Sequence, residues 1–174
     1  DVVCTGYGLV PSIEIGQRLG CSTVWNEARG GWCIATKDFG ATSVERVFAV
    51  GEIAGVGGSE VAVAEGEAAG ELVAGLLHER PVLAHLRTRA RSARAAADAM
   101  LRAFPVRPGL FELAEGDTIV CRCEDVRAVA VRDAAALHGS SLRAIKMGCR
   151  AGMGPCQGRI CTPNVQAIAG AKGT

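Results

Sequence analysis

The chain has 174 residues, of which 49% are hydrophobic but only 4% aromatic, and its formal net charge is +1. This length fits one medium domain or two small ones, with a core built mostly from aliphatic side chains. The near-neutral charge gives no electrostatic reason to expect nucleic acid or an anionic membrane as a partner, and no run reaches the roughly twenty apolar residues of a membrane span. With no basic and apolar leader at its N-terminus, the chain is expected to be cytoplasmic.

Residues 1–78 are predicted to alternate strands with helical segments, as in an α/β fold. Strands are expected for VVCTG, WCIAT and VFAVG, which occupy residues 2–6, 32–36 and 47–51. The last of these is continuously apolar, as in a strand buried on both faces. A short helix is expected after Pro11, and an alanine-rich helix capped by Ser59 is expected to follow the glycine-rich turn GEIAGVGG.

Residues 79–117 are predicted to form a linker that contains one amphipathic helix. Its apolar residues recur every three or four positions, at Leu86, Ala90, Ala93, Ala97, Met100 and Phe104. Four arginines are expected to lie largely off this stripe and to form a solvated basic face: Arg87, Arg91, Arg94 and Arg102.

Residues 118–172 are predicted to form a small, mostly α domain. A short strand in TIVCRC leads into a helix over about 125–137, and a second helical piece follows at LRAIKMG. A glycine-rich loop then carries the remaining cysteines. The last short helix is expected to have Thr162 as its cap and Pro163 in its first turn.

Five of the eight cysteines fall within residues 121–161. Cys121 and Cys123 form one close pair, Cys156 and Cys161 form another, and the intervening residues suffice for a hairpin of two short helices. Thiolates arranged in pairs on tight loops are typical of metal and cluster sites. The spacing alone leaves open an iron–sulfur cluster, a zinc ion and unligated thiols, although zinc sites more often use CxxC pairs.

The motifs CRCEDV and KMGCRAGMGPCQGRIC resemble the two ends of a [2Fe-2S] domain of the bacterioferritin-associated ferredoxin type. Such domains occur at the C-terminus of flavin-containing subunits of amine and amino-acid dehydrogenases. The resemblance implies a [2Fe-2S] cluster with the ligands Cys121, Cys123, Cys156 and Cys161. Cys149 is left outside the ligand set, because the family more often has a small hydroxyl residue at that position.

The other cysteines and the basic residues near the motifs have simpler interpretations. Cys4, Cys21 and Cys33 are expected to be small buried thiols. The basic residues beside the proposed ligands either raise the potential of the cluster or are ordinary surface residues: Arg122, Lys146, Arg150 and Arg159.

The segment TSVERVFAVGE, residues 42–52, together with VVCTGYGLVPS, resembles the C-terminal part of the FAD-binding domain of the pyridine nucleotide-disulfide oxidoreductase superfamily. The resemblance implies FAD contacts through Gly51, Glu52, Gly58 and Ser59, with the acid on the ribityl chain and the next helix facing the flavin. That superfamily more often has Asp at the position of Glu52. No GxGxxG follows a strand, so an N-terminal half absent from this sequence is expected to hold the ADP part of FAD.

These features predict the electron-transfer part of a flavin and iron–sulfur subunit of an amine or amino-acid dehydrogenase complex. Electrons from a CH–NH or CH–NH2 donor are expected to pass through FAD and [2Fe-2S], while a separate flavin subunit oxidises the substrate. No catalytic residue is assigned in this chain, and its three histidines are expected at the surface or at helix ends. The alternatives are a non-catalytic docking module with zinc or a structural cluster, and a truncated inactive fragment.

Overall fold

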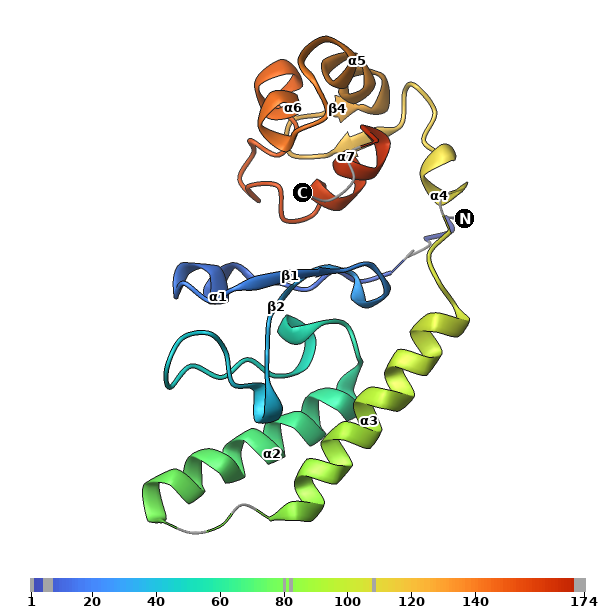
Figure 1. The fold of residues 1–174 in the computed structure, drawn as a ribbon. Helices are drawn as coiled ribbons and strands as arrows, with labels where there is room; N and C mark the ends of the chain where they lie inside the picture. The colour runs from blue at the N-terminus through green and yellow to red at the C-terminus, as the bar shows by residue number, and fades with distance from the viewer. Residues whose placement is uncertain (1, 5–7, 80, 82, 108, 171–174) are drawn as a thin grey trace. The chain divides into compact units, whose positions relative to one another are not determined.

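The computed structural model describes residues 2–4, 8–79, 81, 83–107 and 109–170. The chain divides into two compact units, Asp1–Val106 and Arg107–Thr174. In Figure 1 the first unit is coloured from blue to yellow-green and the second from yellow to red. No helix in the described ranges is long and apolar enough to cross a membrane.

The first unit combines helices with one short antiparallel hairpin. Strand β1 (Thr23–Asn26) pairs with β2 (Gly31–Ile34), and the facing indole rings of Trp25 and Trp32 pack edge to face with centroids 5.6 Å apart. The helical elements are α1 (Glu14–Arg18), η1 (Glu27–Arg29), η2 (Asp38–Gly40), η3 (Gly51–Ala54), α2 (Ser59–His78) and α3 (Ala84–Ala103).

The core of the first unit is small and aliphatic. Ile13, Cys21, Ile34 and Ala49 form a buried cluster behind the hairpin. Helix α1 packs closely on this cluster, since a Cβ added at Gly16 would lie 2.5 Å from the Cδ1 atom of Ile34. Close approach of α1 to β2 therefore requires a glycine at this position.

Helix α2 lies beside the core, and α3, predicted as an amphipathic linker helix, packs against α2. Leu86, Ala90, Ala93 and Ala97 are all half-buried. Met100 and Phe104 of the predicted stripe are 64% and 76% exposed, so the stripe is covered over only part of its length. Figure 1 shows the reason, because α3 continues well beyond its crossing with α2.

Two of the three strands predicted for the first unit are not found in the described residues. Residues 47–51 form no strand, and only one isolated bridge, between Ala41 and Phe48, joins them to a neighbour. The structure places no parallel strand beside this apolar run in the described part of the chain, and the run is irregular backbone between a turn at residues 45–46 and η3. Residues 2–4 are not a strand either, and residues 5–7 of the same prediction lie outside the described residues. The third prediction is confirmed in β2.

The second unit is small and mostly helical, as predicted. Its elements are α4 (Gly109–Glu112), β3 (Ile119–Cys121), β4 (Val126–Arg127), α5 (Ala128–His138), α6 (Leu142–Cys149) and α7 (Thr162–Ile168). Its core contains two of the proposed ligands, in a cluster made of Cys121, Val126, Val131, Ile145, Ala151, Cys161 and Val165. The helical hairpin of α5 and α6 therefore packs directly behind the cysteines.

Two predicted helix caps are displaced by one residue. Gly58 is the N-cap of α2 with φ of 84°, and Ser59 is the first helical residue and makes no capping hydrogen bond. Cys161 is the N-cap of α7, where Thr162 was expected, while Pro163 does lie in the first turn. A residue that caps a helix with its side chain usually has extended backbone at the N-cap. Neither N-cap residue, Gly58 or Cys161, has that conformation, and neither caps its helix with a side chain.

Candidate iron–sulfur site

The first cysteine pair lies on the hairpin of β3 and β4. Cys121 ends β3 and pairs in register with Val126, and residues 122–125 form the turn between the strands. Asp125, with φ of 50°, allows the chain to reverse within this short turn. Cys121 is 1% exposed and points into the core, whereas Cys123 lies on the exposed turn.

The second cysteine pair lies in the loop of residues 150–161, which we call the cysteine loop. It begins at Arg150, which ends α6 in the left-handed conformation with φ of 67°, and it leads into α7 at Cys161. The backbone N–H of Gly152 donates to the sulfur of Cys121, with N and Sγ 3.5 Å apart. The loop therefore reaches back onto the hairpin that carries the first pair.

Glycines allow this close contact. A Cβ at Gly154 would lie 2.3 Å from the Cβ of Cys123, and a Cβ at Gly158 would lie 2.7 Å from the hydroxyl oxygen of Thr162. Gly158 also has φ of 82°, which side chains of L-residues rarely adopt. The GMGPCQGR motif thus has a steric reason for two of its glycines.

The structure brings Cys121 together with Cys161. The Cys161 thiol donates a hydrogen bond to the Cys121 sulfur. Burial and this hydrogen bond raise the pKa of Cys161 to about 12. Burial also acts to raise the pKa of Cys121, but the backbone N–H groups of Gly152 and Glu124 and the Cys161 thiol outweigh it and leave that pKa lowered.

Cys123 and Cys156 form the second contact, again with one lowered and one raised pKa. Backbone N–H groups of residues 158–160, led by Ile160, and the Cys123 thiol lower the pKa of Cys156. The Cys156 backbone N–H lowers the pKa of Cys123, but the hydrogen bond to the Cys156 sulfur, desolvation and nearby sulfurs outweigh it and raise that pKa. Each contact, Cys121 with Cys161 and Cys123 with Cys156, thus joins a sulfur suited to be a thiolate to a sulfur that must lose a proton before it binds a metal.

The positions of the four thiols can be compared with the needs of a zinc ion and of a [2Fe-2S] cluster. Within the part of the chain that the structure describes, no three His, Cys, Asp or Glu side chains converge on one point in a way that would hold a single ion. A tetrahedral zinc site requires four ligands around one point. The thiols of Cys121, Cys123, Cys156 and Cys161, close enough to influence one another electrostatically, would suit a [2Fe-2S] cluster, which would supply one-electron chemistry.

The remaining sulfurs lie outside these pairs. Cys149 is half-buried at the end of α6 and donates to the carbonyl oxygen of Ile145, with Sγ and O 3.3 Å apart. Cys21 and Cys33 are buried as predicted. Cys4 is exposed, so the prediction that it is a buried thiol is wrong, because no described element of the first unit covers it.

The basic residues near the proposed ligands differ in their surroundings. Arg122, Arg150 and Arg159 are exposed, and Lys146 is half-buried beside Gly152. Arg150 pairs with Glu124 on the hairpin turn, with Nε and Oε2 2.9 Å apart. This ion pair links the cysteine loop to the turn that carries Cys123.

The proposed FAD contacts lie in residues 51–58, which we call the glycine loop, and at Ser59 directly after it. One carboxylate oxygen of Glu52 accepts the backbone N–H groups of Gly57 and Gly58, at 3.1 and 2.7 Å. Gly51 is buried and donates its N–H to Glu65 of α2, while Gly58 and Ser59 are exposed. Glu52 therefore stabilises its own loop through Oε1 and leaves Oε2 without a partner among the described residues.

Two residues that contact this loop, Arg94 and Glu65, were not predicted from the sequence. Arg94 was expected on a solvated basic face, but its side chain is 12% exposed and lies against the glycine loop. It follows Ala90 by four positions and precedes Ala97 by three, so helical spacing places it within the apolar stripe. An arginine within the apolar stripe of a helix, such as Arg94, indicates that its guanidinium is buried and needs an acidic partner. Glu65 offered no comparable signal.

The four neighbouring thiols fit a thiolate-ligated iron–sulfur cluster, and the comparisons with known proteins support this interpretation. Residues 119–170 match the family of BFD-like [2Fe-2S] binding domains, a stretch that includes both pairs. The second unit is therefore a [2Fe-2S]-binding domain of this kind, which confirms the resemblance carried by the two cysteine motifs.

Relatives are found along nearly the whole chain. It is 32% identical over 166 residues to an opine oxidase subunit of Rhizobium meliloti strain 1021, covering 93% of this chain and 36% of the relative. It is 30% identical over 171 residues to hydrogen cyanide synthase subunit HcnB of Pseudomonas aeruginosa, covering 92% of this chain and 36% of the relative. The chain thus spans about a third of the length of the curated relatives it matches. No solved structure matches it significantly.

Proposed function

We propose that this chain is the electron-transfer part of a flavin and iron–sulfur oxidoreductase subunit, with Cys121, Cys123, Cys156 and Cys161 as the ligands of its [2Fe-2S] cluster. The observation that carries the proposal is that these four cysteines make two contacts, Cys121 with Cys161 and Cys123 with Cys156. Each contact joins the hairpin of β3 and β4 to the cysteine loop. When bound, the cluster accepts and donates one electron at a time.

The residues of the chain perform three tasks around this centre. Burial of Cys121 and Cys161 excludes water from one side of the site. The N–H of Gly152 and those of residues 158–160 point at ligand sulfurs, where they stabilise negative charge. The cysteine loop and the hairpin turn hold the two pairs in place through glycine contacts and the Arg150–Glu124 ion pair.

The first unit contributes to FAD binding in this proposal. The glycine loop precedes the N-terminus of a long helix, where free N–H groups favour oxygen ligands that carry negative charge. The second carboxylate oxygen of Glu52 is the acceptor for a hydroxyl of the ribityl chain, and Gly51, Gly58 and Ser59 are the other contacts. The rest of the FAD site belongs to a segment beyond this sequence.

The relatives guide the proposal for the assembled protein. Opine oxidase and hydrogen cyanide synthase are the activities that the names of the matched subunits carry. We expect a donor with a CH–NH or CH–NH2 bond, oxidised by a separate flavin subunit, with this chain passing the electrons onward. The domain boundaries at 78 and 117 and a cytoplasmic location belong to the same proposal.

Absorption spectroscopy and metal analysis of the anaerobically purified chain test this function. We expect about two irons per chain and absorption bands between about 400 and 500 nm that dithionite bleaches. A colourless protein with one zinc per chain would contradict the proposal and favour a docking module.

A further inference from the structure

Arg94 of α3, on a helix face predicted to be solvated, binds an acid of α2 and the glycine loop at the same time. Its guanidinium donates to both carboxylate oxygens of Glu65, with Nε–Oε1 and Nη2–Oε2 distances of 2.8 and 2.9 Å. The same group also donates to three backbone carbonyls of the glycine loop. These are the oxygens of Gly55 at 2.8 Å and of Val56 and Gly51 at 3.3 Å.

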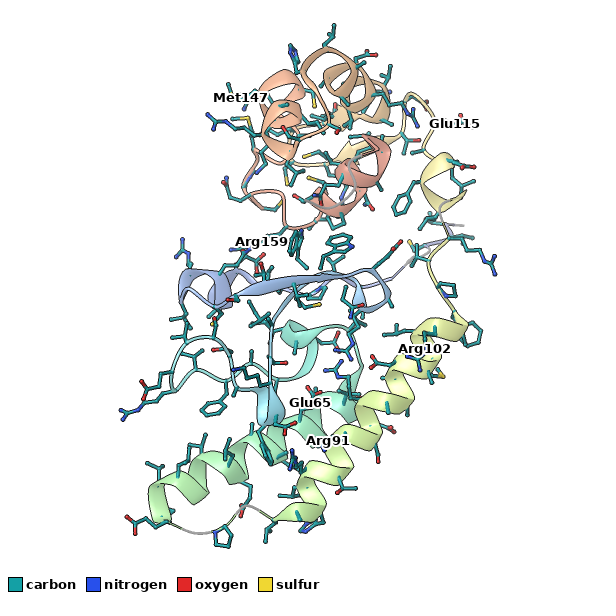
Figure 2. All side chains as sticks on the ribbon, in the orientation of Figure 1. Glu65, Arg91, Arg102, Glu115, Met147 and Arg159 are labelled. Carbon is teal, nitrogen blue, oxygen red and sulfur yellow. The ribbon has the colours of Figure 1, made fainter. Side chains whose placement is uncertain are left out.

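Glu65 completes this contact from the side of α2. Its Oε2 atom accepts the backbone N–H of Gly51 at 2.8 Å while it also accepts from Arg94. The start of the glycine loop is thus bound by its N–H to an acid of α2 and by its carbonyl to an arginine of α3. Figure 2 shows Glu65 on the side of α2 that faces α3.

A second contact comes from one turn further along α3. Asp98 accepts two hydrogen bonds from Arg29 of η1, at 2.8 and 2.5 Å, and both side chains are largely buried. The carbonyl of Arg29 in turn accepts the N–H of Val56 at 3.0 Å. Arg94 and Asp98 are four residues apart and therefore lie on the same face of α3.

The glycines of the loop agree with these two contacts. A Cβ at Gly57 would lie 2.6 Å from the Nη1 atom of Arg94, and a Cβ at Gly55 would lie 2.7 Å from the Cδ atom of Arg29. The loop is therefore packed directly against both arginines. Side chains at these positions would push the arginines out of hydrogen-bonding range.

We propose that α3 positions the glycine loop for FAD through Arg94 and Asp98, an inference that rests on the proposed role of this loop in flavin binding. A loop held by its carbonyls keeps the Glu52 carboxylate and the N-terminus of α2 aligned before the cofactor arrives. Preorganisation of this kind raises affinity because less conformational entropy is lost on binding. Arg94 and Asp98 are positioning residues and make no contact with the flavin themselves.

Hydrogen exchange of the full chain tests the positioning directly. In R94M, the amides of Gly51 and Val56 are expected to exchange at least about tenfold faster than in wild type, since Glu65 loses its anchor and the carbonyls of Gly51 and Val56 lose their donor. R91M is the matched control, because Arg91 is 63% exposed on the same helix and forms its ion pair with Asp38, outside the glycine loop. Equal exchange of Gly51 and Val56 in R94M and R91M would overturn the proposal.

Two further variants keep the test decisive if R94M unfolds. R94K retains a charge beside Glu65 but lacks the planar group that reaches three carbonyls, so the same acceleration is expected. D98N weakens the second contact and should loosen Val56 more than Gly51. The amide of Ala35, which donates to Ser22 in the hairpin region, reports whether the unit stays folded. Wild-type exchange at Gly51 and Val56 in a folded R94K would overturn the role of the carbonyl contacts.

FAD binding separates this inference from the function on which it rests. The wild type and variants are purified with the subunits that accompany them, and FAD affinity is measured by flavin fluorescence. R94M is expected to weaken FAD binding by about tenfold or more, while R91M leaves it unchanged. A loop that loosens with no change in FAD affinity would contradict the flavin role of the glycine loop but not its positioning by α3. A loop that does not loosen contradicts the positioning whatever FAD does.

Discussion

The two loops proposed to serve cofactors are held in opposite ways. The cysteine loop is held mostly by its backbone, through glycines that pack on the hairpin turn and N–H groups that point at sulfurs, with the exposed Arg150–Glu124 ion pair beside them. The glycine loop is held by charged side chains from later helices, at positions 65, 94 and 98. Backbone contacts between two cysteine motifs therefore support the first site, while charged side chains of α2 and α3 support the second.

The family match lies within the second unit, although relatives align along nearly the whole chain. A motif that contains its own support leaves a recognisable sequence signature, as in residues 119–170. The single residues of α2 and α3 that hold the glycine loop form no such motif. Substitutions in the two units can test this difference, and their expected effects range from complete loss of the cluster to a small shift in melting temperature.

Loss of a ligand should have the largest effect. C121S and C156S are each expected to abolish the dithionite-sensitive absorption and to reduce bound iron to near zero, because a serine hydroxyl is a far weaker ligand than a thiolate. Iron analysis and visible spectra of anaerobically purified protein provide the measurement. C149S is the matched control, since the Cys149 thiol donates a hydrogen bond to the carbonyl oxygen of Ile145. The C149S variant should retain full iron. Loss of iron in C149S would contradict the ligand assignment.

Steric disruption of the cysteine loop should come next. G154A places a methyl group within 2.3 Å of the Cβ of Cys123, so the loop must move away from the hairpin turn. Cluster occupancy is expected to fall several-fold, and the apo protein should melt at a lower temperature. Iron content and thermal unfolding measure these effects.

Gly70 of α2 provides the control for this steric effect. A Cβ there would meet nothing within 4 Å. G70A should therefore stabilise the first unit by about 0.5–1 kcal/mol, because alanine favours helix more than glycine does. A destabilised G70A would show that α2 packs more tightly than the structure describes.

Alkylation of the iron-free protein should rank the sulfurs by their pKa. Cys156, whose pKa is lowered, is expected to react first at pH 8, whereas Cys161, with a pKa of about 12, should react last. At that pH the thiolate fraction of Cys161 is roughly a thousandfold below that of an ordinary cysteine. Mass spectrometry of peptides after timed iodoacetamide treatment gives the order. Rapid labelling of Cys161 in folded protein would contradict its environment.

The same thiol predicts how the iron-free protein responds to alkaline pH. The pKa of Cys161 is raised from an ordinary value of 9.0 to about 12 in the folded state. Its contribution to stability is therefore complete below about pH 9 and is lost as the pH rises towards 12, because only the unfolded chain is free to ionise there. Thermal unfolding between pH 8 and 11 should show this decline. C161S should flatten the profile.

The smallest effect is expected for the exposed ion pairs of α3. Arg91 and Arg87 lower the pKa of Asp38 by hydrogen bonds and charge, chiefly through Arg91, so this contribution is present above about pH 4 and is lost at lower pH. Both arginines and Asp38 are strongly exposed, so solvent and salt screen the pairs. R91M should shift the melting temperature only slightly at pH 7. A large shift would indicate that this surface is buried in an assembly.

The sequence predicted individual helices more reliably than it predicted which elements pair or pack with one another. The sequence identified α2, α3, α5 and α6, with α3 predicted from apolar residues that recur every three or four positions and α2 from its alanine-rich composition. VFAVG was predicted as a buried strand, but only one residue of it forms a bridge, because strand formation requires a neighbouring strand that no local pattern specifies. Met100 and Phe104 match the apolar stripe and are nevertheless exposed, since α3 extends beyond its crossing with α2.

The cysteine motifs by themselves determined the class of the second unit and its four proposed ligands. These motifs contain both the proposed ligands and the glycines of the backbone that presents them. Only the tertiary structure decided how the sulfurs pair, Cys121 with Cys161 and Cys123 with Cys156, since pairing depends on how the cysteine loop folds onto the hairpin. It also decided that Arg94 lies against the glycine loop, because a charge on a helix is buried only where another element offers it a carboxylate and carbonyls.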